Sequence, residues 1–320
     1  MFLDFLALRK FPFDLALTSA TLVAVSTLAY SVLYAVWGFT YELFFFSIIV
    51  FAVVGLLTLF LKGLRGSVVV RLLYVVAVLA LFEEILLRSA LAWYGFLLAS
   101  VGLVFLPLVG AVLAGRGTDV RVVFEVCGLL FATRIVLSPL PTNLQGSAAF
   151  LPVVYTLIMC AIVMYLWFRR IPLDKIGLCQ GAVSLPYQLV AGVAVGGVLG
   201  LVEHFILRPP AVEIGANVVI NFLYLLVVMM VFVGLTEELL FRGLLQSYFG
   251  GLMSRWQAVH LSSLIFALFH IGWLNPMEVV FAYCAGVVFG YFFIKTGGLT
   301  APVVAHGFGN VVLYMLALGL

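Results

Sequence analysis

The chain has 320 residues, of which 66% are hydrophobic and only 9% are charged. A soluble domain carries roughly 25% charged residues, so this chain has too few polar side chains to cover a surface that faces water. With a mean hydropathy of +1.30, most of it must face lipid or other helices within lipid. The composition therefore excludes a soluble fold. The small net charge of +3 and the scattered basic residues also argue against nucleic-acid binding.

The apolar runs are continuous rather than alternating, which predicts transmembrane helices and not the strands of a barrel. We predict an all-α, polytopic integral membrane protein with about eleven transmembrane helices. The N-terminus has no basic region ahead of a short apolar core, so we expect its first segment to be retained rather than cleaved. The expected segments are 15–38, 41–61, 67–87, 90–114, 120–137, 149–168, 186–207, 216–236, 256–272, 276–294 and 298–320.

Lysine and arginine residues occur mainly in every second connection between these segments. This pattern is typical of short cytoplasmic loops, which carry an excess of positive charge. Only Arg88, Arg134 and Arg208 fall outside this pattern, and the loop 138–148 has no charge. The pattern predicts a multi-pass protein of the cell membrane with a cytoplasmic N-terminus. The residues on the expected cytoplasmic side are Arg9, Lys10, Lys62, Arg65, Arg71, Arg116, Arg121, Arg169, Arg170, Lys175, Arg242, Arg255 and Lys295.

A shift in composition at residues 171–186, IPLDKIGLCQGAVSLP, divides the chain. We expect an N-terminal membrane extension of about six helices over 1–170 and a C-terminal helix bundle over 171–320. Within the bundle, glycines at four-residue spacing predict smooth helix faces for close packing. These glycines are Gly192, Gly196, Gly200, Gly286 and Gly290. The cysteines are far apart and predict neither a disulfide nor a metal site: Cys127, Cys160, Cys179 and Cys284.

Ionisable side chains inside apolar helices cost about 2.5–3.5 kcal/mol each, so those that occur usually face the protein interior and have a function. The first such cluster is Glu237-Glu238-Leu-Leu-Phe-Arg242, expected at the cytoplasmic end of the eighth segment. Glu238 and Arg242 are four residues apart and can pair, whereas Glu237 points about 100° away and is left free as a base. A salt bridge at a helix end is the alternative interpretation.

Two further clusters follow it. His270 ends an apolar run four residues after Phe266, where a hydrogen-bonded packing histidine is the alternative. His306 and Asn310 share one face of the last helix, and we expect the two glycines between them to leave room for a ligand.

Together the clusters suit the hydrolysis of an amide bond. A glutamate and a histidine can activate a shared water, while a second histidine and an asparagine amide donate hydrogen bonds to an oxyanion. No serine or cysteine nucleophile with a matching base is apparent, and Glu203-His204 is isolated from any His-Glu-x-x-His zinc motif. A metal held by one glutamate and two histidines stays chemically possible.

The order EExxxR, FxxxH and HxxxN on successive helices resembles the CPBP family of intramembrane proteases. That family includes the type II CAAX prenyl endopeptidases and the bacteriocin-processing and immunity proteins. The segments LDKIGL and IKTGGLTAPVVAHGFGN also resemble sequences typical of the family, and the resemblance covers about residues 172–320.

The resemblance implies an intramembrane endopeptidase that hydrolyses a peptide bond of a membrane-associated or lipidated substrate near the cytoplasmic face. Its expected partners are that peptide or protein and the lipid bilayer. It implies that Glu237 activates the water near His270, and that His306 and Asn310 stabilise the oxyanion. We expect no obligatory cofactor, with a divalent metal such as zinc possible. The supporting residues would be Glu238, Arg242 and Phe266.

A second EExxxR motif, Glu83-Glu84-Ile-Leu-Leu-Arg88, lies in the first half of the chain. No histidine precedes His204, and the count of segments places this motif on the external side, opposite Glu237. We interpret it as a chance or vestigial match, with Glu125 and Arg134 pairing with each other or with it. The alternative function is a non-proteolytic transporter, or an immunity or scaffold protein of the same fold, although the sequence has no convincing inverted repeat.

Overall fold

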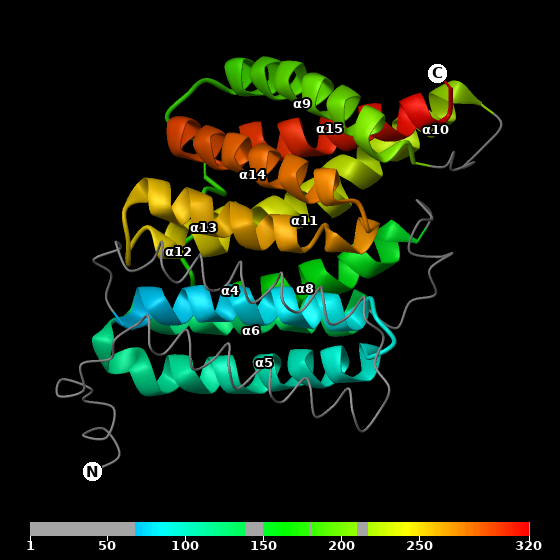
Figure 1. Ribbon diagram of the computed structural model, residues 1–320. Helices are drawn as coiled ribbons and strands as arrows, with labels where there is room; N and C mark the ends of the chain where they lie inside the picture. Colours follow the sequence, from blue (N-terminus) through cyan, green and yellow to red (C-terminus); the bar gives the residue numbers. More distant parts are fainter. Residues whose placement is uncertain (1–67, 138–149, 180, 210–216, 320) are drawn as a thin grey trace, which may run out of the picture. The chain divides into compact units, whose positions relative to one another are not determined.

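The structure is a computed structural model that describes residues 68–137, 150–179, 181–209 and 217–319. These residues form helices and connecting turns, and no strand occurs among them (Figure 1). The all-α prediction is therefore confirmed. The predicted segments 15–38 and 41–61 lie outside the described residues, so the count of about eleven stays a prediction.

Each predicted segment from 67–87 onward corresponds to a helix. The first are α4 (Val68–Leu87), α5 (Ala92–Leu113), α6 (Thr118–Leu137), α8 (Leu151–Arg169) and α9 (Leu185–Leu207). A long helix from Val218 to Phe249 comprises α10 (Val218–Val227), α11 (Leu235–Glu238) and α12 (Ser247–Phe249), joined by the wider π-helical turns η2 (Val228–Gly234) and η3 (Leu239–Gln246). The last are α13 (Arg255–Leu268), α14 (Pro276–Thr296) and α15 (Thr300–Ala317). Short 3₁₀ turns lie at Ala114–Arg116 and Ile271–Trp273.

Six helices in the described part of the chain are long and apolar enough to cross a membrane. They are α5, α8, α9, the helix Val218–Phe249, α14 and α15. Large apolar side chains cover their outward faces, as Trp93 and Phe105 do on α5 and Trp167 does on α8. The protein is therefore an integral membrane protein, as its composition predicts.

The eighth predicted segment differs from the structure. We expected it to end at 236, with Glu237 at the cytoplasmic end, but the helix continues to Phe249. At about 1.5 Å per residue, Glu237 lies roughly 18 Å before the end of the helix. The helix can carry charges this deep because Glu238 and Arg242 are both fully buried and paired with each other.

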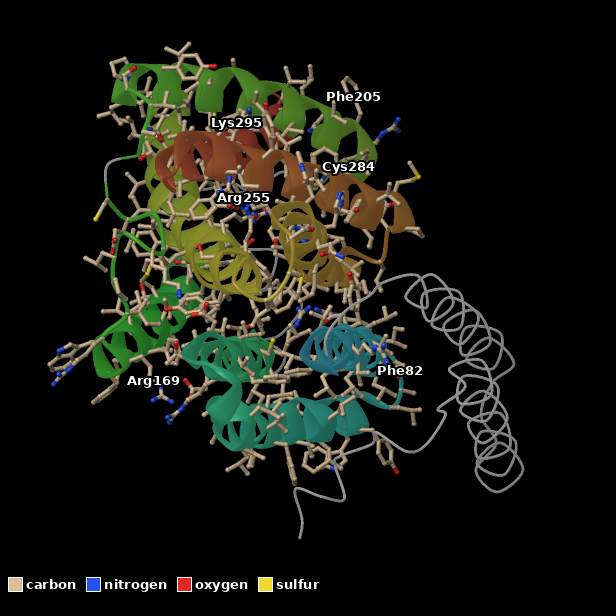
Figure 2. The ribbon with its side chains drawn as sticks, turned by 90° about the vertical axis from the view of Figure 1, so that its left-hand side faces the viewer. Phe82, Arg169, Phe205, Arg255, Cys284 and Lys295 are labelled. Carbon is tan, nitrogen blue, oxygen red and sulfur yellow. The ribbon has the colours of Figure 1, made fainter. Side chains whose placement is uncertain are left out.

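Contacts define two ends of the compact unit Leu72–Leu320. At the first end Lys175 Nζ lies 2.6 Å from Asp119, and the amide of Ala182 donates to the carbonyl of Thr296 at 2.8 Å. Arg169, Arg255 and Lys295 lie in the segments that meet here, and Figure 2 looks onto this side of the molecule. We call it the basic end. The positive-inside rule predicts that it is cytoplasmic, and that orientation stays a prediction.

The opposite end carries the turn between α13 and α14. Asn275 in this turn donates from Nδ2 to the carbonyl of Ile206, near the end of α9, at 3.0 Å. Arg134, near the end of α6, donates to the carbonyl of Leu268, the last residue of α13, at 3.3 Å. We call this the turn end. Since α6 precedes the predicted domain boundary at 170, helices from both predicted domains pack here, and the boundary itself stays a prediction.

Glycines bring the helices of the C-terminal half close together. A Cβ atom on Gly196 or Gly200 of α9 would collide with the backbone of α15, at Ala305 and Gly309 respectively. A Cβ on Gly290 of α14 would lie 2.7 Å from Oε1 of Gln246. The predicted role of these glycines in close helix packing is confirmed, and it places α9, α14 and the Val218–Phe249 helix around α15.

Candidate active site

Glu237 and Glu238 lie between the two wide turns of the Val218–Phe249 helix. π-Helical turns are rare in proteins, and many of those that occur lie at functional sites. They shift the direction of the side chains around them. Gly234, at the end of the first wide turn, faces α15: a Cβ there would lie 3.2 Å from both the amide nitrogen of Gly307 and the carbonyl oxygen of Val303. This close approach brings His306 next to the two glutamates.

Glu238 is the centre of a buried charge network. Its Oε1 accepts a hydrogen bond from Nη1 of Arg242 at 2.8 Å and another from Nδ1 of His306 at 2.7 Å. Arg242 also donates to the carbonyl of Gly286 at 3.0 Å, and its guanidinium lies 4.6 Å from the centre of the Phe266 ring. Since a buried carboxylate is stable only when compensated, these partners explain how Glu238 is kept inside the protein. The predicted pairing of Glu238 with Arg242 is confirmed.

The imidazole of His306 is held in one orientation. Its ring stacks on Phe289 with centroids 5.2 Å apart and meets the edge of Phe266 at 5.6 Å. Because Nδ1 donates to Glu238, the other nitrogen, Nε2, is directed toward Glu237, whose Oε2 is 3.8 Å away. That separation is too long for a direct hydrogen bond, but it lies within reach of one shared water molecule.

Glu237 differs from Glu238 in its access to water. Its side chain is 19% exposed, whereas that of Glu238 is 0% exposed. Its Oε1 accepts a hydrogen bond from the hydroxyl of Tyr155 on α8, so this carboxylate is oriented by a helix from the first half of the chain. Sequence reasoning missed Tyr155, because nothing distinguishes it from the other aromatic residues of an apolar segment.

His270 lies in the turn after α13, which ends at Leu268. Its Nδ1 donates to the carbonyl of Phe266 at 3.0 Å, because a carbonyl oxygen can only accept. Its ring lies against that of Phe266, with centroids 4.6 Å apart. Phe266 therefore contacts both histidines, and Nε2 of His270 is free to bind a water or a substrate. Glu237 interacts electrostatically with His270.

One cavity brings the predicted polar residues together. His270, His306 and Asn310 line it, along with Phe266, and it has room for about one water molecule. The expected role of the two glycines between His306 and Asn310 is confirmed for Gly309, which lines the cavity, but both glycines also serve helix packing. Gly307 faces Met229 and Met230, and Gly309 faces the backbone of α9 at Gly196.

In the described part of the chain, no group of three or more histidine, cysteine, aspartate or glutamate side chains is arranged to hold a metal ion. Glu238 and the Phe266 carbonyl engage Nδ1 of His306 and Nδ1 of His270, which leaves Nε2 of each ring for a water or a metal. A reaction without an obligatory metal stays a prediction. All four cysteines are free thiols, as predicted.

The comparison with family models matches residues 219–312 to the type II CAAX prenyl endopeptidase Rce1-like family. Residues 219–312 are thus similar to that family, and we call them the Rce1-like region. The matched range contains Glu237, His270, His306 and Asn310, and it confirms the resemblance stated from the sequence motifs. It covers less than half of the chain. No curated protein and no solved structure matches the sequence.

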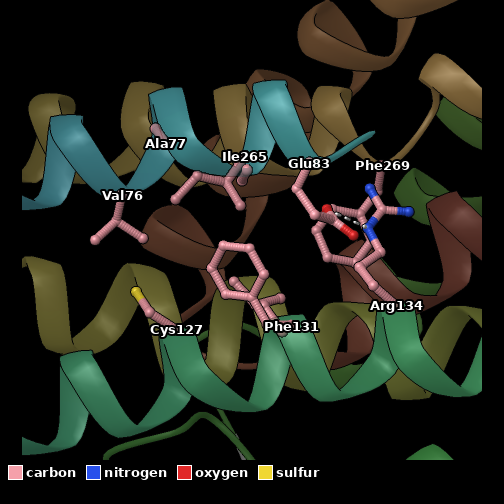
Figure 3. A pocket seen from close by; sticks show the side chains of 10 residues that line it. Val76, Ala77, Glu83, Cys127, Phe131, Arg134, Ile265 and Phe269 are labelled. Atoms are coloured by element: carbon pink, nitrogen blue, oxygen red, sulfur yellow. Dashed lines mark ion pairs between the residues drawn. The ribbon is translucent and has the colours of Figure 1, made fainter. Parts of the chain in front are cut away.

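Residues outside the Rce1-like region also reach its site. The second EExxxR motif is buried, with Glu84 3.2 Å from Arg88 and 3.1 Å from Arg134 of α6 (Figure 3 shows Glu83 beside Arg134). Arg134 in turn contacts Leu268 and interacts electrostatically with Glu237. The expectation that this motif lies opposite Glu237 is therefore wrong: helix packing puts both at one level.

The predicted partners of this motif are partly confirmed. Arg134 pairs with it across helices, as expected for a structural role. Glu125 instead binds Arg121, Arg169 and the hydroxyl of Tyr165 near the basic end. The motif thus joins α4 and α6 to the turn that carries His270, within the Rce1-like region.

Proposed function

We propose that this protein is an intramembrane endopeptidase that hydrolyses a peptide bond of a membrane-associated substrate. The Rce1-like match supports a protease at the level of the class, and the apolar helices place it in the membrane. The observation that carries the finer proposal is the cavity shared by His270, His306 and Asn310, with Glu237 beside it.

In the proposed reaction Glu237 removes a proton from a water molecule held between its carboxylate and the histidines. The water oxygen attacks the peptide carbonyl, and the resulting oxyanion accepts hydrogen bonds from the Asn310 amide and from Nε2–H of His306. Glu238 accepts from Nδ1 of His306 and thereby stabilises the imidazolium form needed for that donation. The proton on Glu237 then passes to the departing amine, so the carboxylate is regenerated.

The depth of the site in the helix bundle indicates where along the membrane the substrate would be cleaved. His270 lies at the turn end, and Glu237 is bonded to Tyr155 near the start of α8, away from the basic end. If the basic end is cytoplasmic, the reacting groups lie in the other half of the bundle. We therefore propose cleavage within the membrane rather than at its cytoplasmic face, as a revision of the expectation drawn from the sequence.

The experiment uses the purified full chain in lipid nanodiscs with a panel of membrane-anchored fluorogenic peptides. Glu237→Gln and His270→Ala should each lower cleavage by about 10²–10⁴-fold, because the first removes the base and the second removes a group that holds the water. His260→Ala is the matched control, since His260 is an exposed histidine bonded to Tyr283 outside the cavity. Cleavage that survives both site variants would overturn the proposal.

A further inference from the structure

Two carboxylates in the wall of the cavity have no part in the proposed hydrolysis. Glu203 comes from the last turns of α9, and Glu278 comes from the first turn of α14. They face the same cavity as His270, His306 and Asn310. Neither belongs to the motifs EExxxR, FxxxH or HxxxN.

Glu278 is fully buried at 0% exposure, and neither of its carboxylate oxygens has a hydrogen-bond partner among the described residues. Glu203 interacts electrostatically with it, so two carboxyl groups share one enclosed space. Among the described residues, no arginine, lysine or histidine forms an ion pair with either glutamate. A buried carboxylate without a counter-charge is costly, and two together more so.

A comparison with Glu238 shows that Glu203 and Glu278 lack a compensating cation. Glu238 is equally buried, but Arg242 and His306 compensate it. The described residues thus supply cations for Glu238 and none for the pair formed by Glu203 and Glu278. A cation brought by a bound molecule can therefore pair with these two carboxyl groups.

We propose that Glu203 and Glu278 form a subsite for a lysine side chain of the peptide substrate. This inference rests on the proposed function, because it places the cation beside the bond held near Glu237 and His270. An ammonium group is close in size to a water molecule, which the cavity accommodates. A carboxylate at the same place would be disfavoured, so the subsite discriminates a basic side chain from an acidic one.

The test uses matched membrane-anchored peptides that differ at one position, with lysine, norleucine or glutamate placed in turn at each position flanking the cleaved bond. At one of these positions the wild-type protein should cleave the lysine peptide with a kcat/KM at least about tenfold above the norleucine peptide. In Glu278→Gln and in Glu203→Gln that ratio should fall toward about one. Glu203→Lys should favour the glutamate peptide over the lysine peptide, a reversal that mere loss of structure cannot produce.

A binding measurement separates this inference from the proposed function. The Glu237→Gln protein in nanodiscs is titrated with the lysine and norleucine peptides, with and without Glu278→Gln as a second change. Cleavage by the wild type without any lysine preference would overturn the subsite and leave the protease. Preferential binding of lysine that Glu278→Gln abolishes, with no cleavage by any form, would support the subsite and overturn the protease. Equal binding of both peptides would overturn the subsite.

Discussion

Arg134 of α6 donates a hydrogen bond to the carbonyl of Leu268 at 3.3 Å, two residues before His270 in the chain. Its guanidinium also lies 3.5 Å from the centre of the Phe269 ring. Nη2, the nitrogen that donates to Leu268, also lies 3.1 Å from a carboxylate oxygen of Glu84. The EExxxR motif of the first half therefore anchors the turn that presents His270 to the cavity.

Removal of Arg134 should loosen this turn and destabilise the fold. Arg134→Met leaves Glu84 buried and without its cross-helix partner, a change that typically costs about 3–5 kcal/mol. Thermal unfolding in detergent and peptide cleavage both report it, and Arg134→Lys should restore part of each. Arg121→Met is the control, because Arg121 is 43% exposed and its pair with Glu125 should contribute less than about 1 kcal/mol. Equal effects of the two methionine variants would refute the anchoring role.

Tyr155→Phe should lower kcat more than it lowers stability. The change removes the hydroxyl that donates to Glu237, so the proposed base loses its orientation while the aromatic ring stays. Hydrogen bonds to charged groups contribute about 1.5–3 kcal/mol, which corresponds to a loss of about tenfold or more in rate. Tyr165 lies on the same helix as Tyr155, away from the cavity, and its hydroxyl donates to Glu125. Tyr165→Phe therefore removes a comparable hydrogen bond. We expect full activity in that control, and a loss in both variants would count against a specific role for Tyr155.

Substitutions of the two adjacent glutamates should have different effects on activity and on stability. Glu237→Gln should fold normally but cleave poorly, because Glu237 is partly exposed and is proposed to act on water. Glu238→Gln should lose both properties, since it removes the charge that binds Arg242 and His306 inside the protein. The expected destabilisation of Glu238→Gln is about 3–5 kcal/mol by chemical unfolding. If Glu237→Gln were the less stable of the two, the assigned roles would be reversed.

Close packing of α9 on α15 should depend on glycines that have no Cβ atom at the contact. Gly200→Ala places a Cβ against the carbonyl of Gly309, which is backbone and cannot move aside cheaply. We expect a loss of about 1–3 kcal/mol, measured as a lower Tm. Gly197→Ala is the matched control on the same helix, because its Cβ would lie 3.7 Å from the Phe308 ring, in ordinary contact. Because alanine favours a helix more than glycine does, a control variant that is equally unstable would show that the contact with Gly309 does not explain the loss.

Removal of metal ions should leave cleavage unchanged. A glutamate and a histidine suffice to activate a water, and the described residues offer no group of three or more histidine, cysteine, aspartate or glutamate side chains that could hold a metal ion. Dialysis against a strong chelator, followed by elemental analysis and the peptide assay, measures this directly. Activity lost with the metal and regained on addition of zinc would contradict the metal-free reaction.

The candidate site was predictable because its signals are local. Four-residue spacing on a helix places Glu238 and Arg242 on one face, and it relates His306 to Asn310 in the same way. The depth of Glu237 was not predictable, because hydropathy marks charged residues as the end of a span. The buried pairing with Arg242 and His306 removes that penalty, and only the folded chain supplies His306 to Glu238.

The sequence by itself determined that this protein lies in the membrane, where its helices run and which polar residues merit attention, because composition and helical spacing are properties of neighbouring residues. Only the tertiary structure decided that Tyr155 and Arg134 reach the site, and that Glu203 and Glu278 share its cavity. The physical reason is that helices far apart in sequence pack side by side. Their contacts depend on glycine faces and buried charges that meet only after the chain has folded.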